Sequence, residues 1–269
     1  MAKSTEVAKT EATANAVAGY DYGDYAGKGY DDLGSGDYSI PFINILQSNS
    51  PEVEDDDFPD AKAGLLFNNV TKELFSSLPF MIAKIDKRFV EWKPRDAGGG
   101  YIGDYEPANP YVSQCLRLSE EKGLPYGKIT TPSGNQLVET YQIYGLFLDP
   151  TGSESIGFGI LSMTSMKIKP TKNWLTTLRT TLKGKIPLLA YRTVLGTVKE
   201  KNDKGTFYNP TFKPLGDTWV ASAVPPTSAL LEEVSQFREM IESGAAKVDM
   251  SKQSNDAGAG KGPDDEIPF

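Results

Sequence analysis

The chain of 269 residues contains no histidine and a single cysteine, Cys115. Histidine is the commonest general base and the commonest metal ligand, so its absence excludes a Ser-His-Asp triad and argues against a metal site. One cysteine excludes a disulfide within the chain and a zinc site built from cysteines, and it is typical of a reducing compartment. We therefore expect no metal and no cofactor.

Two kinds of segment are also missing from the sequence. No apolar run approaches the length that crosses a membrane, and the first residues lack the apolar core of a signal peptide, which predicts a soluble cytoplasmic protein. The three glycines at 98–100 are not followed by Gly-Lys-Ser/Thr, so they do not form a phosphate-binding loop. With no nucleotide motif and no catalytic constellation, the chain is predicted not to be an enzyme.

The charge of the chain is divided between its ends and its middle. The net charge is −8, but residues 1–60 hold thirteen acids against three lysines, and residues 251–269 hold four acids against two lysines. Residues 161–213 instead hold eleven Lys and Arg against only Glu200 and Asp203, a net charge of +9. Acidic ends around a basic middle favour a body that binds a polyanion.

Composition divides the chain into four segments. Residues 1–37 set tyrosines among Gly and Asp and predict a disordered arm. Residues 38–243 hold the apolar segments and predict one nucleic-acid-binding domain. Residues 244–263 predict a flexible linker, since residues 251–263 contain no apolar side chain larger than Ala and cannot offset the entropy of ordering. Residues 264–269 form an acidic tip.

Short segments of strand length, separated by turn signals, dominate the body. They lie at residues 39–47, 65–70, 74–75, 80–85, 88–92, 140–148, 155–163, 190–199, 206–213 and 217–223. Two helices are predicted, one at 171–182, where Trp174 and Leu178 recur at helical spacing, and one at 227–243. Residues 96–138, rich in Gly, Pro and Tyr, predict a long loop or a weakly structured insertion.

The fold class that this order predicts is mainly β with two helices. A Greek-key barrel of the oligonucleotide-binding (OB) type accommodates the elements, if it is elaborated by an inserted loop and the basic helix and is flanked by disordered N- and C-terminal arms. A β-sandwich is the alternative, and periodicity alone does not decide between the two.

Candidate DNA-binding residues lie in the stretch that follows the strand at 88–92. Trp92, Lys93 and Arg95 place an aromatic ring beside two cations, and the following glycines permit close approach of a ligand. The alternative for Trp92 is a place in the core. Loop tyrosines are common partners of bases, and four lie in the predicted insertion: Tyr101, Tyr105, Tyr111 and Tyr126.

A second candidate stretch, residues 166–185, contains six cations and no acid. Its candidate contacts to phosphate and base are Lys167, Lys169, Lys172, Trp174, Arg179, Lys183 and Lys185. Threonines among them could add hydrogen bonds to phosphate. A solvated charged face is the alternative, but acids normally accompany such a face. Trp174 fits the core side of an amphipathic helix better than a stacking platform.

The chain finishes with three acids, two apolar residues and a proline: Asp264, Asp265, Glu266, Ile267, Pro268 and Phe269. This tip resembles that of bacterial single-stranded DNA-binding proteins, whose final residues read Asp-Asp-Asp-Ile-Pro-Phe, and differs from it only by Glu266. A terminal aromatic can enter an apolar pocket while its carboxylate meets an Arg and the acids meet a basic rim. The resemblance implies that the tip docks partner proteins.

The resemblance and the basic middle together predict a phage-encoded single-stranded DNA-binding protein of the host cytoplasm. The segments 39–47 and 90–95 are also similar to phage proteins of this role. Such a protein would coat single strands without strong sequence preference during DNA replication or recombination. It would recruit a helicase, polymerase, primase or nuclease through the tip. The alternatives are a duplex- or RNA-binding adaptor or annealing factor, and a virion assembly protein; the oligomeric state stays open.

Overall fold

A computed structural model describes residues 39–54, 57–125, 127–202, 205–246, 248 and 250. The arm predicted at 1–37, Tyr126 and the tip at 264–269 lie outside the described residues, as do the side chains of Arg95 and Leu182. The body of the chain is built mostly from antiparallel strands.

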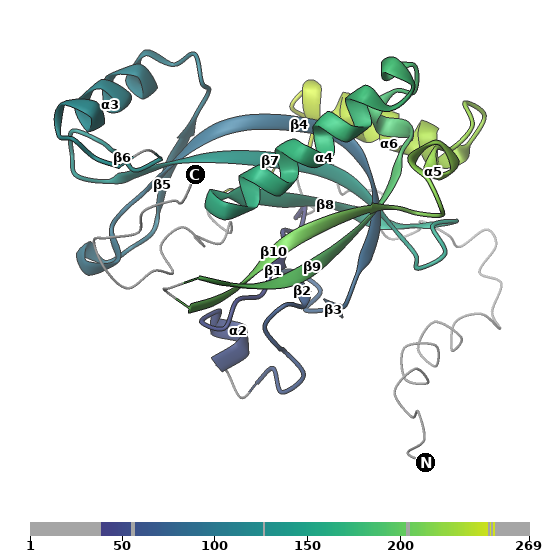
Figure 1. Ribbon diagram of the computed structural model, residues 1–269, viewed down its shortest axis with the longest axis horizontal. Coiled ribbons are helices and arrows are strands. Elements are labelled where there is room, and N and C mark those ends of the chain that lie inside the picture. Colours follow the sequence, from purple (N-terminus) through teal and green to yellow (C-terminus); the bar gives the residue numbers. More distant parts are fainter. Residues whose placement is uncertain are drawn as a thin grey trace. The chain divides into compact units, whose positions relative to one another are not determined.

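In the described part, seven antiparallel strands form the main sheet (Figure 1). Its two longest strands, β4 (Leu78–Trp92) and β7 (Gln136–Leu148), pair at its centre. Branched and aromatic residues fill both strands, which favours extended backbone. The other strands are β5 (Tyr101–Tyr105), β6 (Ile129–Thr130), β8 (Ser155–Thr164), β9 (Arg192–Asn202) and β10 (Gly205–Pro214).

Strands β4 and β7 each serve two parts of the sheet because they are longer than their neighbours. β9 pairs with β4 from Leu78 to Met81, whereas β5 pairs with it from Phe89 to Trp92. β8 pairs with β7 from Thr140 onward, and β6 pairs only with its first two residues. One end of the sheet therefore runs β10-β9-β4-β7-β8, and the other runs β5-β4-β7-β6.

A second, smaller sheet lies against the edges of the five-stranded end. Gln47 binds the backbone of Tyr208 in β10: its Nε2 donates to the carbonyl oxygen at 3.0 Å, and its Oε1 accepts from the amide at 2.9 Å. On the other side, Phe42 forms a β-bridge with Ile160 of β8. The strands of this sheet are β1 (Ile43–Ile45), β2 (Leu66–Asn68) and β3 (Leu74–Phe75).

The predicted class, mainly β with two helices, is confirmed as mainly β, but the described residues contain more helices than the two predicted. Strands β8 and β10 do not pair with each other, so the described strands do not form a closed barrel, and the OB barrel predicted from the sequence is not confirmed at that level of detail. The consecutive segments predicted at 65–70 and 74–75, at 140–148 and 155–163, and at 190–199 and 206–213 pair as the hairpins β2–β3, β7–β8 and β9–β10. Their turns were recognisable from Asn, Asp, Pro and Gly between apolar runs.

Two helices cover opposite faces of the sheet. We call the face under α4 (Ile168–Thr180) the inner face: there Trp174 and Leu178 pack in the core cluster that contains Phe80 of β4 and Phe147 of β7. Figure 1 shows α4 running across the strands. Under α6 lies the outer face, where Phe237 of the helix stacks on Phe158 with ring centroids 4.1 Å apart. This second helix spans Ala229–Glu242.

The chain after α6 also lies on the outer face. Ala246, Val248 and Met250 pack against the same cluster as α6. Gln142 of β7, which is fully buried, donates from Nε2 to the Met250 sulfur at 3.5 Å. The described chain thus reaches its last residue on the face opposite to α4.

The prediction of a loop or weakly structured insertion at 96–138 is wrong. This stretch contains β5, β6 and the helix α3 (Pro110–Glu121), at the end of the sheet in Figure 1. Asn109 caps the helix by accepting from the Tyr111 amide at 2.9 Å, and Pro110 suits the first helical position. Val112 and Cys115 bury against the sheet. Helix α3 was not predicted because the stretch is rich in Gly, Pro and Tyr and the helix buries few apolar residues.

Smaller differences concern single elements. The segments at 80–85 and 88–92 form one strand, β4, because Asp86 and Lys87 between them also pair with β7. The strand predicted at 217–223 is instead the short helix α5 (Trp219–Ser222), capped by Thr218. The helix predicted at 227–243 is confirmed as α6. Remaining elements are α2 (Pro51–Glu54) and the 3-10 turns at Arg95–Ala97, Ser165–Lys167, Thr181–Gly184 and Leu188–Ala190.

Candidate nucleic-acid interface

The exposed side of α4 and the turn that follows it carry cations, most of which have no ion pair within the described residues. Its other side buries Thr171, Trp174 and Leu178, so the charged side chains turn to solvent. We define the basic helix face by its exposed residues, which are Lys169, Lys172, Arg179, Lys183 and Lys185. Within the described residues, only Lys172 of this set has an ion pair, with Glu139 of β7 at 3.9 Å. The face is therefore largely uncompensated positive charge.

The end of the basic helix face depends on an unusual backbone conformation. Lys183 has a φ of 54°, in the left-handed region that few residues other than glycine adopt, and Gly184 follows at 73°. This turn ends the helical run and leaves Lys183 and Lys185 exposed. Strained backbone of this kind persists where the surrounding structure requires it.

Three candidates from the sequence are buried. Lys167 is 6% exposed and does not belong to the basic helix face. Trp174, 4% exposed, stacks on Phe212 with ring centroids 4.1 Å apart. Trp92 is 5% exposed and meets Tyr101 edge-on. Because neither tryptophan offers a ring face to solvent, neither is positioned to stack on a base. Lys93 is exposed at the end of β4.

The threonines of α4 use their hydroxyl protons within the helix. Each hydroxyl donates to the carbonyl four residues earlier, as Thr176 does to Lys172 at 2.8 Å and Thr180 does to Thr176 at 2.9 Å. Thr171, Thr177 and Thr181 do the same. A hydroxyl has one proton to donate, so the predicted hydrogen bonds from these threonines to phosphate are not available in this arrangement.

The hydroxyls of the candidate tyrosines form hydrogen bonds that stabilise the insertion. Glu91 of β4 is a buried carboxylate, 3% exposed, that accepts from Tyr105 at 2.8 Å, Tyr111 at 3.4 Å and Asn135 at 2.7 Å. Burial and the hydrogen bond to Glu91 raise the pKa of Tyr105 to about 12. Tyr101 donates to Asp104 at 2.8 Å, and burial followed by that bond raises its pKa. These tyrosine hydroxyls are therefore used in hydrogen bonds that stabilise the fold.

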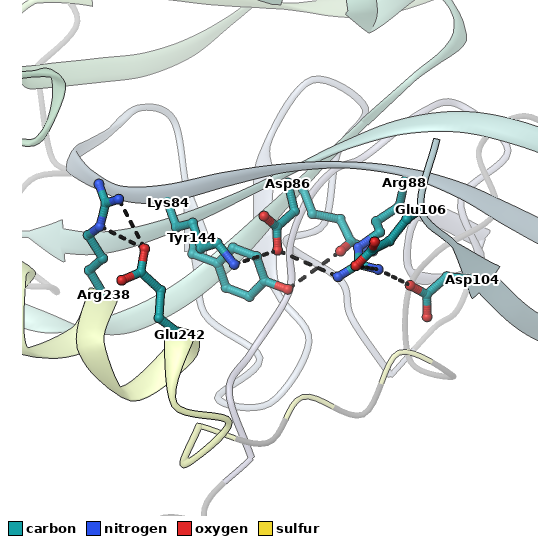
Figure 2. Close-up of polar contacts among 9 residues, drawn as sticks. Lys84, Asp86, Arg88, Asp104, Glu106, Tyr144, Arg238 and Glu242 are labelled. Atoms are coloured by element: carbon teal, nitrogen blue, oxygen red, sulfur yellow. Dashed lines mark hydrogen bonds and ion pairs between the residues drawn. The ribbon is translucent and has the colours of Figure 1, made fainter. Parts of the chain in front are cut away.

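Cations on the outer face are paired, in contrast to those on α4. Lys84, Asp86 and Arg88 lie on the same side of β4, as Figure 2 shows. Asp86 lies 3.1 Å from Lys84 and 3.9 Å from Arg88. Arg88 also meets Asp104 at 3.7 Å and Glu106 at 3.4 Å. On α6, Arg238 pairs with Glu242 at 3.0 Å. The outer face therefore has no comparable excess of positive charge among these residues.

Two residues that the sequence did not single out lie on the inner face beside α4. Lys87 of β4 is directly opposite Tyr141 of β7 in the register. Glu139 of β7 connects Lys87 with Lys172 of α4: its Oε1 lies 2.7 Å from Lys87 Nζ and 3.9 Å from Lys172 Nζ. We call Lys87, Glu139, Tyr141 and Lys172 the Tyr141 cluster. Alternation places Lys87 and Tyr141 each on one face, but only the strand register brings them together.

Other kinds of site are not evident in the part of the chain that the structure describes. Those residues contain no group of three or more Cys, Asp and Glu side chains arranged to hold a metal ion. None of their helices is long and apolar enough to span a membrane.

Comparison with families of known proteins gives one match. The model of the family described as Pam3 phage gp34-like protein matches residues 8–247. No curated protein and no solved structure matches the chain. The match spans the sheet, both covering helices and the Tyr141 cluster.

Proposed function

We propose that this chain, which belongs to the Pam3 phage gp34-like protein family, binds single-stranded DNA without strong sequence preference during phage DNA replication or recombination. The observation that carries the proposal is the basic helix face. Its cations are exposed and, Lys172 apart, have no ion pair within the described residues, while cations on the outer face are paired. A polyanion bound there releases its counterions without first breaking protein ion pairs.

The fold supports a strand lying on the inner side. Five strands in the order β10-β9-β4-β7-β8, with β1–β3 against the open edges, suit an open and elaborated relative of the OB barrel. We propose that DNA follows α4 and the adjacent inner face. Hydrogen exchange with and without bound oligonucleotide tests this placement. Protection is expected in α4 and around Lys185, and protection confined to α6 would contradict it.

The proposal is tested first by binding affinity. Fluorescence anisotropy with a labelled oligo(dT), a duplex of equal length and the matching RNA, each at two salt concentrations, separates the alternatives. We expect preference for the single strand and a steep fall of affinity with salt, because each phosphate contact releases a counterion. Equal or tighter binding to duplex would favour the adaptor function, and no binding to any of the three would refute the proposal.

A pair of charge-matched variants tests the basic helix face itself. Reversing Arg179→Glu and Lys183→Glu removes two phosphate contacts and adds two repulsive charges, so affinity for oligo(dT) should fall at least tenfold and its salt dependence should weaken. The control is Arg117→Glu with Lys122→Glu on α3, which has the same change in charge at exposed positions. If both pairs lose affinity equally, only the overall charge matters and the basic helix face is not the site.

As part of the same proposal, the tip at 264–269 is a docking segment for a replication or recombination protein. Its support is the resemblance of residues 264–269 to the bacterial tip. A peptide of residues 261–269, synthesised with a free carboxylate or with a C-terminal amide, tests the mechanism against candidate helicase, polymerase, primase and nuclease partners. Binding that requires both Phe269 and the free carboxylate is expected. Equal binding by the amide would refute the carboxylate anchor.

A further inference from the structure

We propose that Tyr141 is the residue on which a base of the bound strand stacks, and that Glu139 restrains the two lysines that lie over its ring. This inference rests on the proposed binding of single-stranded DNA, which it makes specific to one aromatic residue. It replaces the two tryptophans that the sequence suggested, since both are buried.

Two ammonium groups lie over the ring of Tyr141 on the inner face. Lys172 Nζ from α4 is 5.7 Å from the ring centroid, and Lys87 Nζ from β4 is 6.0 Å from it. The side chains of Lys87 and Lys172 are 40% and 51% exposed. Both can therefore turn toward a phosphate while the base meets the ring. Aromatic rings beside cations are the recurrent means of holding single strands.

The hydroxyl of Tyr141 distinguishes it from Tyr144 on the same strand and from the described tyrosines of the insertion. Tyr101, Tyr105, Tyr111 and Tyr144 each donate to a side-chain oxygen. No described residue bonds to the Tyr141 hydroxyl, and the side chain is only partly buried at the border of the core. Its ring is thus neither fixed by a hydrogen bond nor enclosed, in contrast to the rings that hold the insertion.

Glu139 controls the charge beside this ring. Its Oε1 is the atom that both lysines contact, and it is closed to solvent between them. A single carboxylate thus faces two ammonium groups. An arriving phosphate must compete with that carboxylate for the lysines, so Glu139 lowers the affinity of the site for a polyanion.

The connection to α4 follows from Lys172, which belongs both to the Tyr141 cluster and to the basic helix face. A strand whose phosphates follow α4 would bring a base to the inner face at this shared residue. Sequence-independent binding follows, because every base has a face that can stack on an aromatic ring.

The experiment compares oligo(dT) with an abasic oligonucleotide of equal length, since the abasic strand keeps the phosphates and lacks the bases. Native protein should prefer oligo(dT), and Tyr141→Leu should reduce that preference about tenfold, the effect expected of one stacked base. Tyr141→Phe should keep it. Affinity for the abasic strand should stay the same in all three proteins. An unchanged preference in Tyr141→Leu would overturn the assignment.

A second measurement avoids any variant that fails to fold. Native protein is irradiated with an oligonucleotide containing 5-iododeoxyuridine, and the cross-linked residue is found by mass spectrometry. A cross-link at Tyr141 is expected, and cross-links confined to other aromatic residues would refute the proposal. Failure of native protein to bind oligo(dT) at all would instead refute the proposed function, so the two failures are distinguishable.

Glu139 is tested with a matched control. Glu139→Gln removes the competing charge and should raise affinity for both the oligo(dT) and the abasic strand several-fold at low salt, with less effect at high salt. Glu106→Gln makes the same change in charge beside Arg88 on the outer face and should have little effect. Equal effects of the two variants, or no effect of Glu139→Gln, would contradict the restraint.

Discussion

At the residue scale, Glu91 shows how a carboxylate can be buried without an ion pair to any arginine or lysine among the described residues. Tyr105, Tyr111 and Asn135 each donate to its oxygens, and hydrogen bonds to an ionised acceptor are stronger than those between neutral groups. The three donors come from β5, α3 and the turn before β7. Glu91 therefore ties the insertion to the end of β4.

Glu91→Ala should destabilise the protein by about 2–4 kcal/mol, because it leaves three buried donors without an acceptor. Urea unfolding measures the change. Glu106→Ala is the control, since the Glu106 side chain is exposed and pairs with Arg88 at the surface, and it should cost less than about 0.5 kcal/mol. Similar losses in both variants would show that the buried network contributes little.

Sequence reasoning placed the exposed cations better than the aromatics. The spacing of Trp174 and Leu178 located the buried side of the helix, and the exposure of Arg179 follows from it. Trp92 could not be placed in the same way, because a tryptophan at a strand end beside cations suits either a core or a surface. Its burial depends on Val138 and Tyr101, which reach it only because β7 and β5 pair with β4.

At the element scale, the turn between β7 and β8 is organised by one carboxylate. Asp149 accepts from the backbone amides of Thr151 at 2.9 Å, Ser153 at 2.7 Å and Glu154 at 2.8 Å. Burial opposes its ionisation, but these bonds and the one from the Thr151 hydroxyl outweigh it and lower its pKa to about 2. The turn therefore depends on the charged form of Asp149.

Because the pKa of Asp149 is lower in the folded protein than its ordinary value of 3.8, its stabilisation is present above that value. It is lost as the pH falls toward about 2. Asp149→Asn should lower the melting temperature at about pH 7 by a few degrees, and the difference from native protein should shrink below about pH 4. Asp217→Asn, at an exposed position, is the control. A difference that is independent of pH would contradict this account.

Turn chemistry explains which elements the sequence could predict. Asp149 and the glycine at 152 marked the β7–β8 hairpin, and similar residues marked β9–β10, since few residue types suit such turns. Helix α3 was missed because its apolar face is short. The Tyr141 cluster could not be predicted from the sequence for another reason. Its residues meet only in the observed register of β4 against β7, and the bulge after Ile82 shifts that register.

At the scale of the whole molecule, the acidic tip at 264–269 and the basic helix face carry opposite charges and can attract each other. Truncation of residues 264–269 removes three acidic side chains that can compete with phosphate for the basic helix face. We expect affinity for oligo(dT) to rise a few-fold at low salt, and the gain to disappear as salt screens the charges. Anisotropy titrations at several salt concentrations measure both effects.

Removal of Phe269 alone serves as the control for this truncation. It leaves Asp264, Asp265 and Glu266 in place, so DNA affinity should stay near that of the full chain while binding of a docked partner falls. A rise in DNA affinity equal to that of the full truncation would show that the acids are not the competing groups.

The contact between Gln142 and Met250 places the last described residue on the outer face, opposite to α4. If a single strand runs along α4, that residue lies on the back of each DNA-bound copy. In a row of such copies along one strand, the backs would face away from the DNA. An enzyme recruited through the chain beyond Met250 would then approach from the side opposite to the nucleic acid.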